Sequence, residues 1–326
     1  MSSVTDAAAA RAPSSAVTPG AKPTIPLSGY AFAAGGAILF ASKGIIIKLA
    51  YAEGVDPETL LALRMLFSLP FYVVIGALAL FRMRGQAEPL PSARIVLFSA
   101  LVGALGYWFA SYTDFLGLQY ISASYARLIL FTYPLFVVLF GALLFKLPVK
   151  GKALWAFAVA YSGLALIFAQ NFSHLGHDAV LGTGLVALTA MSFALYQVLA
   201  SRLLKHIGSA LFTCIAMIAA SAAALGQFAV THPLEKLIVT PHVFWLSVML
   251  AIGATVLPTF LMNAALSRIS AQANAMISTM SPVATMVLAV LILGEPTTAL
   301  DVFGALLVTF SIGWFTLSDR KSGRGA

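Results

Sequence analysis

Apolar residues along the chain fall into ten runs, each long enough to cross a membrane as a helix. A bilayer core about 30 Å thick takes roughly 20 residues of helix, and short polar or charged segments separate the runs. The runs are Leu27–Ala50, Thr59–Phe81, Ile95–Leu118, Ser122–Phe145, Ala153–Phe172, Val180–Leu199, Ala210–Val230, Phe244–Ser267, Ala271–Leu293 and Ala299–Leu317. Since each span in lipid must satisfy its own backbone hydrogen bonds, we expect an all-α integral membrane protein.

Composition supports this fold class. The 326 residues are 60% hydrophobic and only 9% charged, whereas a soluble domain carries about 25% charged residues. The net charge of +8 comes from basic residues that are spread between the apolar runs. These residues do not form the clustered basic face that binds nucleic acid. Cys214 is the only cysteine, so an intrachain disulfide is excluded.

The positions of Lys and Arg predict which loops face the cytoplasm, because cytoplasmic loops carry an excess of both. With the N-terminus inside, fourteen basic residues fall in inside segments and Lys236 alone falls in an outside loop. The fourteen are Arg11, Lys22, Arg82, Arg84, Arg94, Lys146, Lys150, Lys152, Arg202, Lys205, Arg268, Arg320, Lys321 and Arg324. This division predicts both termini in the cytoplasm. Residues 1–26 are rich in Ala, Ser, Pro and Thr, so we expect them to form a disordered tail, with residues 318–326 as a second tail.

An internal repeat divides the chain into two halves. Ile121-Ser122-Ala123 precedes Pro134 at the same interval at which Ile269-Ser270-Ala271 precedes Pro282. Pro148 and Pro296 form a third pair, and all three pairs are 148 positions apart. Three landmarks at one offset indicate a duplication, which we place at residues 27–172 and 173–317.

The number of spans in each half predicts how the halves are related. Five is odd, so the second half enters the membrane upside down, which is the inverted-repeat architecture of many secondary transporters. Such proteins bind substrate near the midplane, between the halves. Pro134 and Pro282 fall in the middles of the fourth and ninth runs, where proline removes a backbone donor and kinks the helix.

The stretch from Ser281-Pro282-Val283 through Gly294-Glu295-Pro296 to Gly304 resembles the end of an EamA domain. Arg64, Ser42-Lys43 and Lys48 resemble the first repeat of the same family. The resemblance covers residues 27–317 and implies a ten-helix carrier of the drug/metabolite transporter superfamily in the bacterial inner membrane, often an exporter of amino acids or related metabolites. The first half departs from the pattern, with Tyr133 before its proline and Lys146-Leu147-Pro148 in place of Gly294-Glu295-Pro296.

Charged residues inside the runs are the sharpest candidates for a site, because each costs about 2.5–3.5 kcal/mol at bilayer depth. Lys43, Arg64, Asp114 and Arg127 all come from the first half, whereas the runs of the second half contain no charge beyond Asp301, near the start of the tenth run. We expect Arg64 to form a structural ion pair with a nearby acid. Lys43 and Arg127 either line a cavity or pair with Asp114. The excess positive charge would then attract an anionic group of the substrate.

Uncharged polar and aromatic residues extend this candidate site, although each aromatic residue is equally compatible with simple packing. The predicted substrate-binding residues are Lys43, Tyr107, Trp108, Arg127, Tyr133, Pro134, Gln197, Asn263, Asn274 and Pro282. If transport is coupled to protons, Asp114 is the first candidate and Glu295 the second. The five histidines fall in loops or at the ends of runs, so we expect no metal, no cofactor and no enzyme.

The sequence therefore predicts a secondary transporter that moves a small metabolite, such as an amino acid or a related anionic compound, by alternating access. Export is the expected direction, and the expected location is the bacterial inner membrane. A passive channel is the first alternative, and an intramembrane enzyme is the second. Its expected partners are a small-molecule substrate and the lipid bilayer, without nucleic acid. The substrate's identity, the coupling ion and the oligomeric state stay open.

Overall fold

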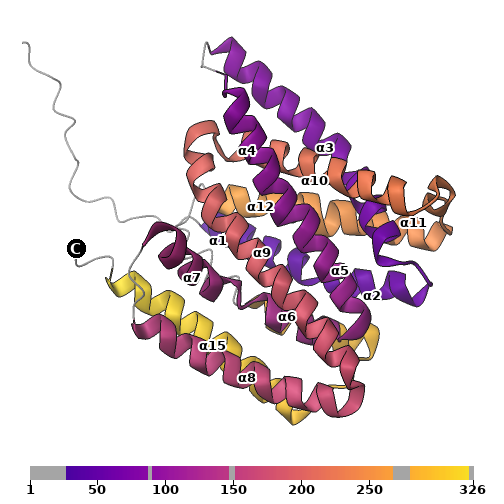
Figure 1. Ribbon diagram of the computed structural model, residues 1–326, viewed down its shortest axis with the longest axis vertical. Coiled ribbons are helices and arrows are strands. Elements are labelled where there is room, and N and C mark those ends of the chain that lie inside the picture. Colours follow the sequence, from indigo (N-terminus) through magenta and orange to yellow (C-terminus); the bar gives the residue numbers. More distant parts are fainter. Residues whose placement is uncertain (1–26, 87–89, 147–150, 267–279, 323–326) are drawn as a thin grey trace, which may run out of the picture.

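The computed structural model describes residues 27–86, 90–146, 151–266 and 280–322, and every regular element in these ranges is a helix. The α-helices are α1 (Leu27–Ala41), α2 (Lys43–Ala52), α3 (Pro57–Gly85), α4 (Ala93–Gly103), α5 (Ala110–Tyr120), α6 (Ala123–Leu130), α7 (Tyr133–Phe145), α8 (Gly151–Leu175), α9 (His177–Ile207), α10 (Ser209–Thr231), α11 (Pro241–Val248), α12 (Leu257–Leu266), α14 (Met280–Leu288) and α15 (Ala299–Ser322). Shorter helical segments are η1 (Ala104–Phe109), η2 (Leu234–Leu237), η3 (Met249–Val256) and η4 (Ala289–Leu293). The helices pack into an elongated bundle (Figure 1).

The helices bear out a multi-pass membrane protein. Seven of them, within the described residues, are long and apolar enough to cross a bilayer. These seven segments are Ser28–Ala52, Pro57–Gly85, Ala93–Tyr120, Ala123–Leu144, His177–Ala200, Ala210–Thr231 and Pro241–Met262. Three shorter apolar helices, Ala158–Ile167, Ser281–Leu293 and Ala299–Ser311, fall in the remaining predicted runs. The count of ten spans therefore stays a prediction.

Helix ends repeat at the offset of 148 positions that the sequence indicated. Ser92 accepts a hydrogen bond from the amide of Ile95 at the start of α4, and Thr240 accepts one from the amide of Val243 at the start of α11. Such caps satisfy amides that a helix start leaves unbonded. The landmarks found in the sequence did not include these two caps. They extend the repeat to the starts of the third and eighth predicted spans.

The third and eighth predicted spans also share a local irregularity. Each contains a π-helical segment, η1 in the third and η3 in the eighth. A π-helical turn leaves a carbonyl without its usual partner, and such turns often lie at functional sites. Ser192 of α9 donates a hydrogen bond of 2.9 Å to the carbonyl of Leu105 in η1. Nothing in the hydrophobic pattern predicted either segment.

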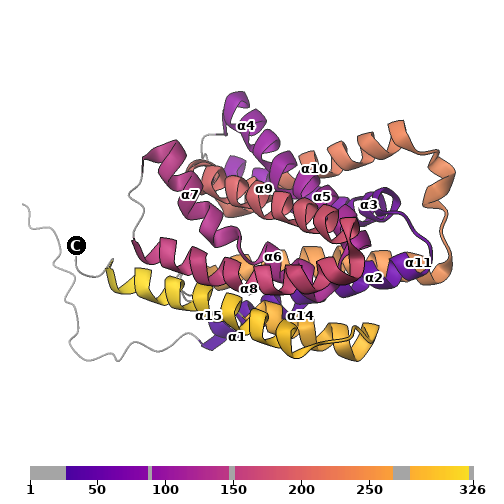
Figure 2. The same cartoon turned by 60° about the horizontal axis from the view of Figure 1, so that its bottom comes forward.

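Contacts between helices follow a two-fold pattern. Helix α3, the second predicted span, packs on α10, the seventh, and α8, the fifth, packs on α15, the tenth. Helix α5 packs on α9, and α1 packs on α12, so exchanging the two halves converts one pairing into the other. Figures 1 and 2 show α8 and α15 side by side, with the end of α15 near the start of α8, so the two run in opposite directions.

Pro134 interrupts the fourth predicted span, as the sequence predicted. Helix α6 ends at Leu130, Phe131 and Thr132 form a turn, and α7 starts at Tyr133. Proline has no amide to bond the carbonyl four residues earlier, which here belongs to Leu130. Pro282 lies in the first turn of α14, and the residues before Met280 lie outside the described ranges.

Candidate functional site

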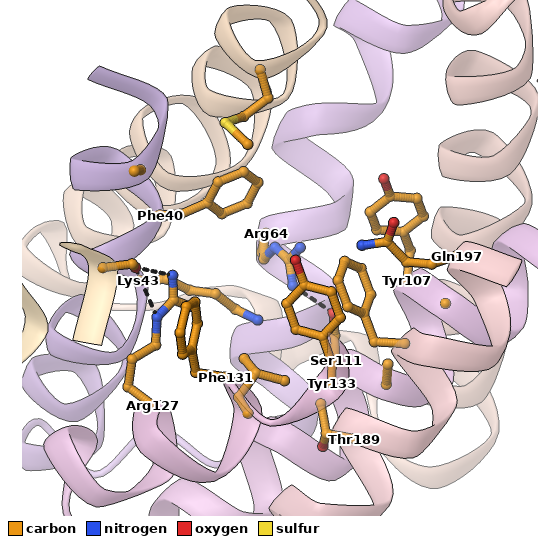
Figure 3. Close-up of a pocket in the computed structure, with 17 residues that line it drawn as sticks. Phe40, Lys43, Arg64, Tyr107, Ser111, Arg127, Phe131, Tyr133, Thr189 and Gln197 are labelled. Atoms are coloured by element: carbon orange, nitrogen blue, oxygen red, sulfur yellow. Dashed lines mark hydrogen bonds between the residues drawn. The ribbon is translucent and has the colours of Figure 1, made fainter. Parts of the chain in front are cut away.

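A cavity of about 210 Å³ lies between the two halves of the chain. Side chains from α1, α2, α3, η1, α5, α6 and α7 of the first half line it, together with residues of α9, α12 and α14 of the second. Figure 3 shows Lys43 and Arg127 on one side, Tyr107 and Gln197 on the other, and Arg64 between them. The break between α6 and α7 opens onto this cavity, because Leu130, Phe131 and Tyr133 all line it.

Lys43 stands at the start of α2, directly after the irregular turn at Ser42. Its ammonium group lies 2.8 Å from a carboxylate oxygen of Asp114, and it also lies over the ring of Phe115 at 5.4 Å. Both partners are on α5. The pairing that the sequence offered for Asp114 is therefore made with Lys43, which also lines the cavity.

In the part of the chain that the structure describes, Arg64 does not form the ion pair that the sequence led us to expect. Its guanidinium is buried, and its Nε donates to the hydroxyl of Thr255 at 2.9 Å while Nη1 donates to Ser111 at 3.0 Å. Within the described residues, no carboxylate lies at ion-pair distance from it. The predicted structural ion pair of Arg64 was wrong, because hydroxyl groups far away in sequence occupy the positions next to it. Arg64 lines the cavity instead.

Arg127 projects from α6 and reaches the second half of the chain. Its Nε donates to the hydroxyl of Ser281 at 3.1 Å, and Nη2 donates to the same oxygen. Ser281 is the residue at the repeat position equivalent to Tyr133. The contact therefore joins α6 to α14 at the cavity wall, and the structure describes no carboxylate within ion-pair distance of Arg127.

These contacts leave the cavity with an excess of positive charge. Lys43, Arg64 and Arg127 line it, and Asp114 is the one acid paired with them in the described part of the chain. Hydroxyl groups satisfy hydrogen bonds but carry no charge. A buried charge without a counter-charge is costly, so an anionic group placed in the cavity would lower this cost.

The opposite wall is aromatic. The rings of Tyr107 and Tyr196 lie 5.0 Å apart with a hydroxyl-to-hydroxyl hydrogen bond of 3.2 Å, and the rings of Tyr133 and Phe193 lie 5.2 Å apart. Gly106 permits this packing, because a Cβ there would fall 2.2 Å from Tyr196. Rings that bury apolar surface and present a hydroxyl suit a small organic molecule.

The remaining predicted site residues differ in where the structure places them. Tyr107, Tyr133 and Gln197 line the cavity with Lys43 and Arg127, whereas Pro282 is buried beside the lining residue Ser281. Pro134 and Asn263 lie in α7 and α12, but their side chains are outside the described part of the structure. Asn274 falls within residues 267–279, which also lie outside it.

Trp108 does not line the cavity. Its indole N–H donates to Gln227 at 2.7 Å, and Gln227 in turn donates to Glu58 at 3.3 Å. Glu58 also accepts from Tyr112 at 3.0 Å and lies 2.9 Å from His232. Trp108 therefore belongs to a polar cluster that joins α3, η1, α5 and α10, separate from the cavity.

Glu295, the second candidate for proton coupling, lies at the start of α6 rather than in the cavity. One carboxylate oxygen accepts from the amide of Ala123 at 2.8 Å, and the other accepts from the hydroxyl of Ser124 at 3.0 Å. A carboxylate at a helix N-terminus is favoured by the unbonded amides and by the helix dipole. The preceding Gly294 has a φ of +64°, which suits glycine.

Sequence reasoning missed Ser111, Thr255 and Ser281 as partners of the arginines. Two of them come from the other half of the chain, 191 positions from Arg64 and 154 from Arg127. The sequence offered only a general indication of these partners, because a buried arginine needs hydrogen-bond acceptors. For the described residues, no group of three or more His, Cys, Asp or Glu could hold a metal ion.

Comparison with known proteins identifies the family. The model of the EamA-like transporter family matches residues 27–169 and again residues 180–317. A curated relative from Bacillus subtilis (strain 168), named an uncharacterized transporter YcbK, is 29% identical over 303 residues, covering 89% of this chain and 93% of the relative. A solved crystal structure of a protein 19% identical in sequence matches with a TM-score of 0.60, over 90% of this chain and 97% of that one, and supports the fold alone.

Proposed function

Because the chain belongs to the EamA-like transporter family, we propose that it carries a small metabolite with an anionic group, such as an amino acid or a related compound, across the bacterial inner membrane. The observation that carries this proposal is the cationic cavity between the two halves. Lys43, Arg64 and Arg127 line it, and Asp114 balances one of the three charges. Both termini are cytoplasmic in this proposal, and the expected direction is export.

Alternating access is the proposed mechanism. Opposite directions of the paired helices α8 and α15 support an inverted repeat (Figure 1), and such repeats expose a central site to each side in turn. Two contacts hold α6 against the second half, one between Arg127 and Ser281 at the cavity and one between Glu295 and the start of α6. With the topology predicted from Lys and Arg, the Glu295 contact lies on the outer side, where it would close the cavity.

The function can be tested in two stages. Comparing the metabolites in the medium of overexpressing and null cells identifies a compound that appears outside only when the protein is present. Purified protein in liposomes is then expected to exchange that labelled compound against the same unlabelled compound, with saturation. A flux that neither saturates nor shows exchange would indicate a channel and overturn the carrier mechanism.

Arg127→Gln is the matched variant for the binding site. It is expected to lower exchange while the amount of protein in the membrane stays unchanged, because the glutamine keeps a hydrogen-bond donor near Ser281 but removes the charge. Unchanged exchange by this variant would remove Arg127 from the proposed site.

A further inference from the structure

We infer that the cavity selects substrates with two separate negative groups, such as a small dicarboxylate. This inference rests on the proposed function and narrows its substrate class. Its starting point is the balance of charge around the cavity. Three basic side chains line it, and the Lys43–Asp114 pair at 2.8 Å neutralises one. Arg64 and Arg127 therefore leave about two positive charges for a ligand to balance.

Both guanidinium groups keep donors for a ligand. A guanidinium has five N–H donors, and each of these two uses a pair of its nitrogens in the hydrogen bonds that the structure describes. All the acceptors in those bonds are hydroxyl groups, from Ser111, Thr255 and Ser281. Hydroxyls fix the direction of each arginine without cancelling its charge, which suits a site that must bind and release an anion.

The two arginines are held at separate places. Arg64 on α3 is fixed between α5 and η3, whereas Arg127 on α6 is fixed against α14. Figure 3 shows Arg64 near the middle of the cavity and Arg127 at one side. Two cations at different walls match a molecule with an anionic group at each end better than they match a single carboxylate. The cavity volume of about 210 Å³ favours a small molecule.

Specificity would follow from desolvation. A ligand with one negative charge leaves one buried arginine without a counter-charge, and a neutral ligand leaves two. Since leaving a buried charge unpaired is costly, the expected order of affinity is dianion, then monoanion, then neutral analogue. Each lost charged contact is expected to weaken binding about tenfold or more.

The test is thermal unfolding of the purified full chain in detergent with succinate, monomethyl succinate or succinamide, at ionic strength matched with KCl. The three probes have similar size and differ in charge. A ligand that binds the folded state raises the unfolding temperature. We expect the largest rise with succinate, a smaller one with monomethyl succinate and none with succinamide. Glycerol 3-phosphate, which carries two charges on one group, forms the second arm, and a larger rise with it than with succinate would overturn the preference for two separate anionic groups.

Two variants keep the test specific. Arg64→Gln and Arg127→Gln are each expected to make the response to succinate equal to that of monomethyl succinate, while Lys236→Gln, outside the cavity, leaves the order intact. Equal responses to succinate, monomethyl succinate and succinamide, or a larger response to either analogue than to succinate, would also overturn the inference. Saturable exchange of a monoanion or neutral metabolite in liposomes would do the same while leaving the carrier function in place.

Discussion

The two halves of the chain share a framework but contribute different chemistry to the cavity. Both contain a capped third helix, a π-helical segment and a left-handed residue at the end of their fourth span. The first half supplies the cations Lys43, Arg64 and Arg127, whereas the second supplies the hydroxyls of Thr255 and Ser281. The shared features concern backbone geometry, and the differences concern charge. The duplication therefore preserves the backbone framework, whereas the basic side chains that line the cavity come from the first half, and we propose that this half supplies the charge that binds the substrate.

The largest effect on transport is expected when a basic residue of the first half is replaced by a neutral hydrogen-bond donor. Arg64→Gln is expected to lower transport about tenfold to a hundredfold, because it removes a charged contact worth about 1.5–3 kcal/mol. Thr255→Ala removes only the hydroxyl that orients Arg64 and is expected to have a smaller effect. Liposome exchange at equal protein content measures both. A larger loss from Thr255→Ala would contradict the assignment of binding to the first half.

The next effect concerns the contact from the second half to the first. Glu295→Ala removes the acceptor of the Ala123 amide and of the Ser124 hydroxyl, which is expected to lower the free energy of unfolding by about 1–3 kcal/mol. Glu295→Gln keeps an acceptor and is expected to lose less. Glu235→Ala, at an exposed position, is the control. Thermal unfolding in detergent gives the order, and equal values for the three variants would exclude a structural role for Glu295.

A smaller effect is expected where the framework itself differs. Lys146 has a φ of +53° and Gly294, its repeat equivalent, has a φ of +64°. A left-handed conformation costs a residue other than glycine about 1–2 kcal/mol, so Lys146→Gly is expected to stabilise the protein by about 1 kcal/mol and Gly294→Ala to destabilise it by a similar amount. Lys146→Ala is the control that removes the charge but keeps the strained backbone. If Lys146→Ala stabilises as much as Lys146→Gly, the gain comes from the charge.

The smallest effect is a dependence on pH at the start of α3. Partial burial would raise the pKa of Asp56, but hydrogen bonds from the amide and hydroxyl of Thr59, with Lys236 and His232 nearby, lower this pKa below its ordinary value. The ionised carboxylate therefore stabilises the fold at pH values above about 3.9, the unfolded pKa, and this contribution is lost as pH falls through the folded pKa. The unfolding temperatures of wild type and Asp56→Asn are expected to differ at neutral pH and converge in acid. A difference independent of pH would contradict this account.

Much of the fold followed from the sequence, because hydrophobic runs, basic loops and proline positions act locally. The proline predicted an interruption of the helix at Pro134, and Lys43 was one of the partners expected for Asp114. The surroundings of Arg64 could not be predicted, since Thr255 approaches it only after the two halves have packed. The π-helical segments left no periodic signal, and the hydrogen bond that Glu295 accepts comes from a helix start 172 positions away in the sequence.

The most direct test of the central claim compares Arg127→Gln, Arg127→Lys and Ser281→Ala in liposome exchange of the compound found by metabolite profiling. If the first half binds the substrate through its charge, Arg127→Lys retains much of the activity, Ser281→Ala loses part of it, and Arg127→Gln loses most. Equal activity of Arg127→Gln and wild type, at equal protein content, would contradict the claim that the cationic half of the cavity holds the substrate.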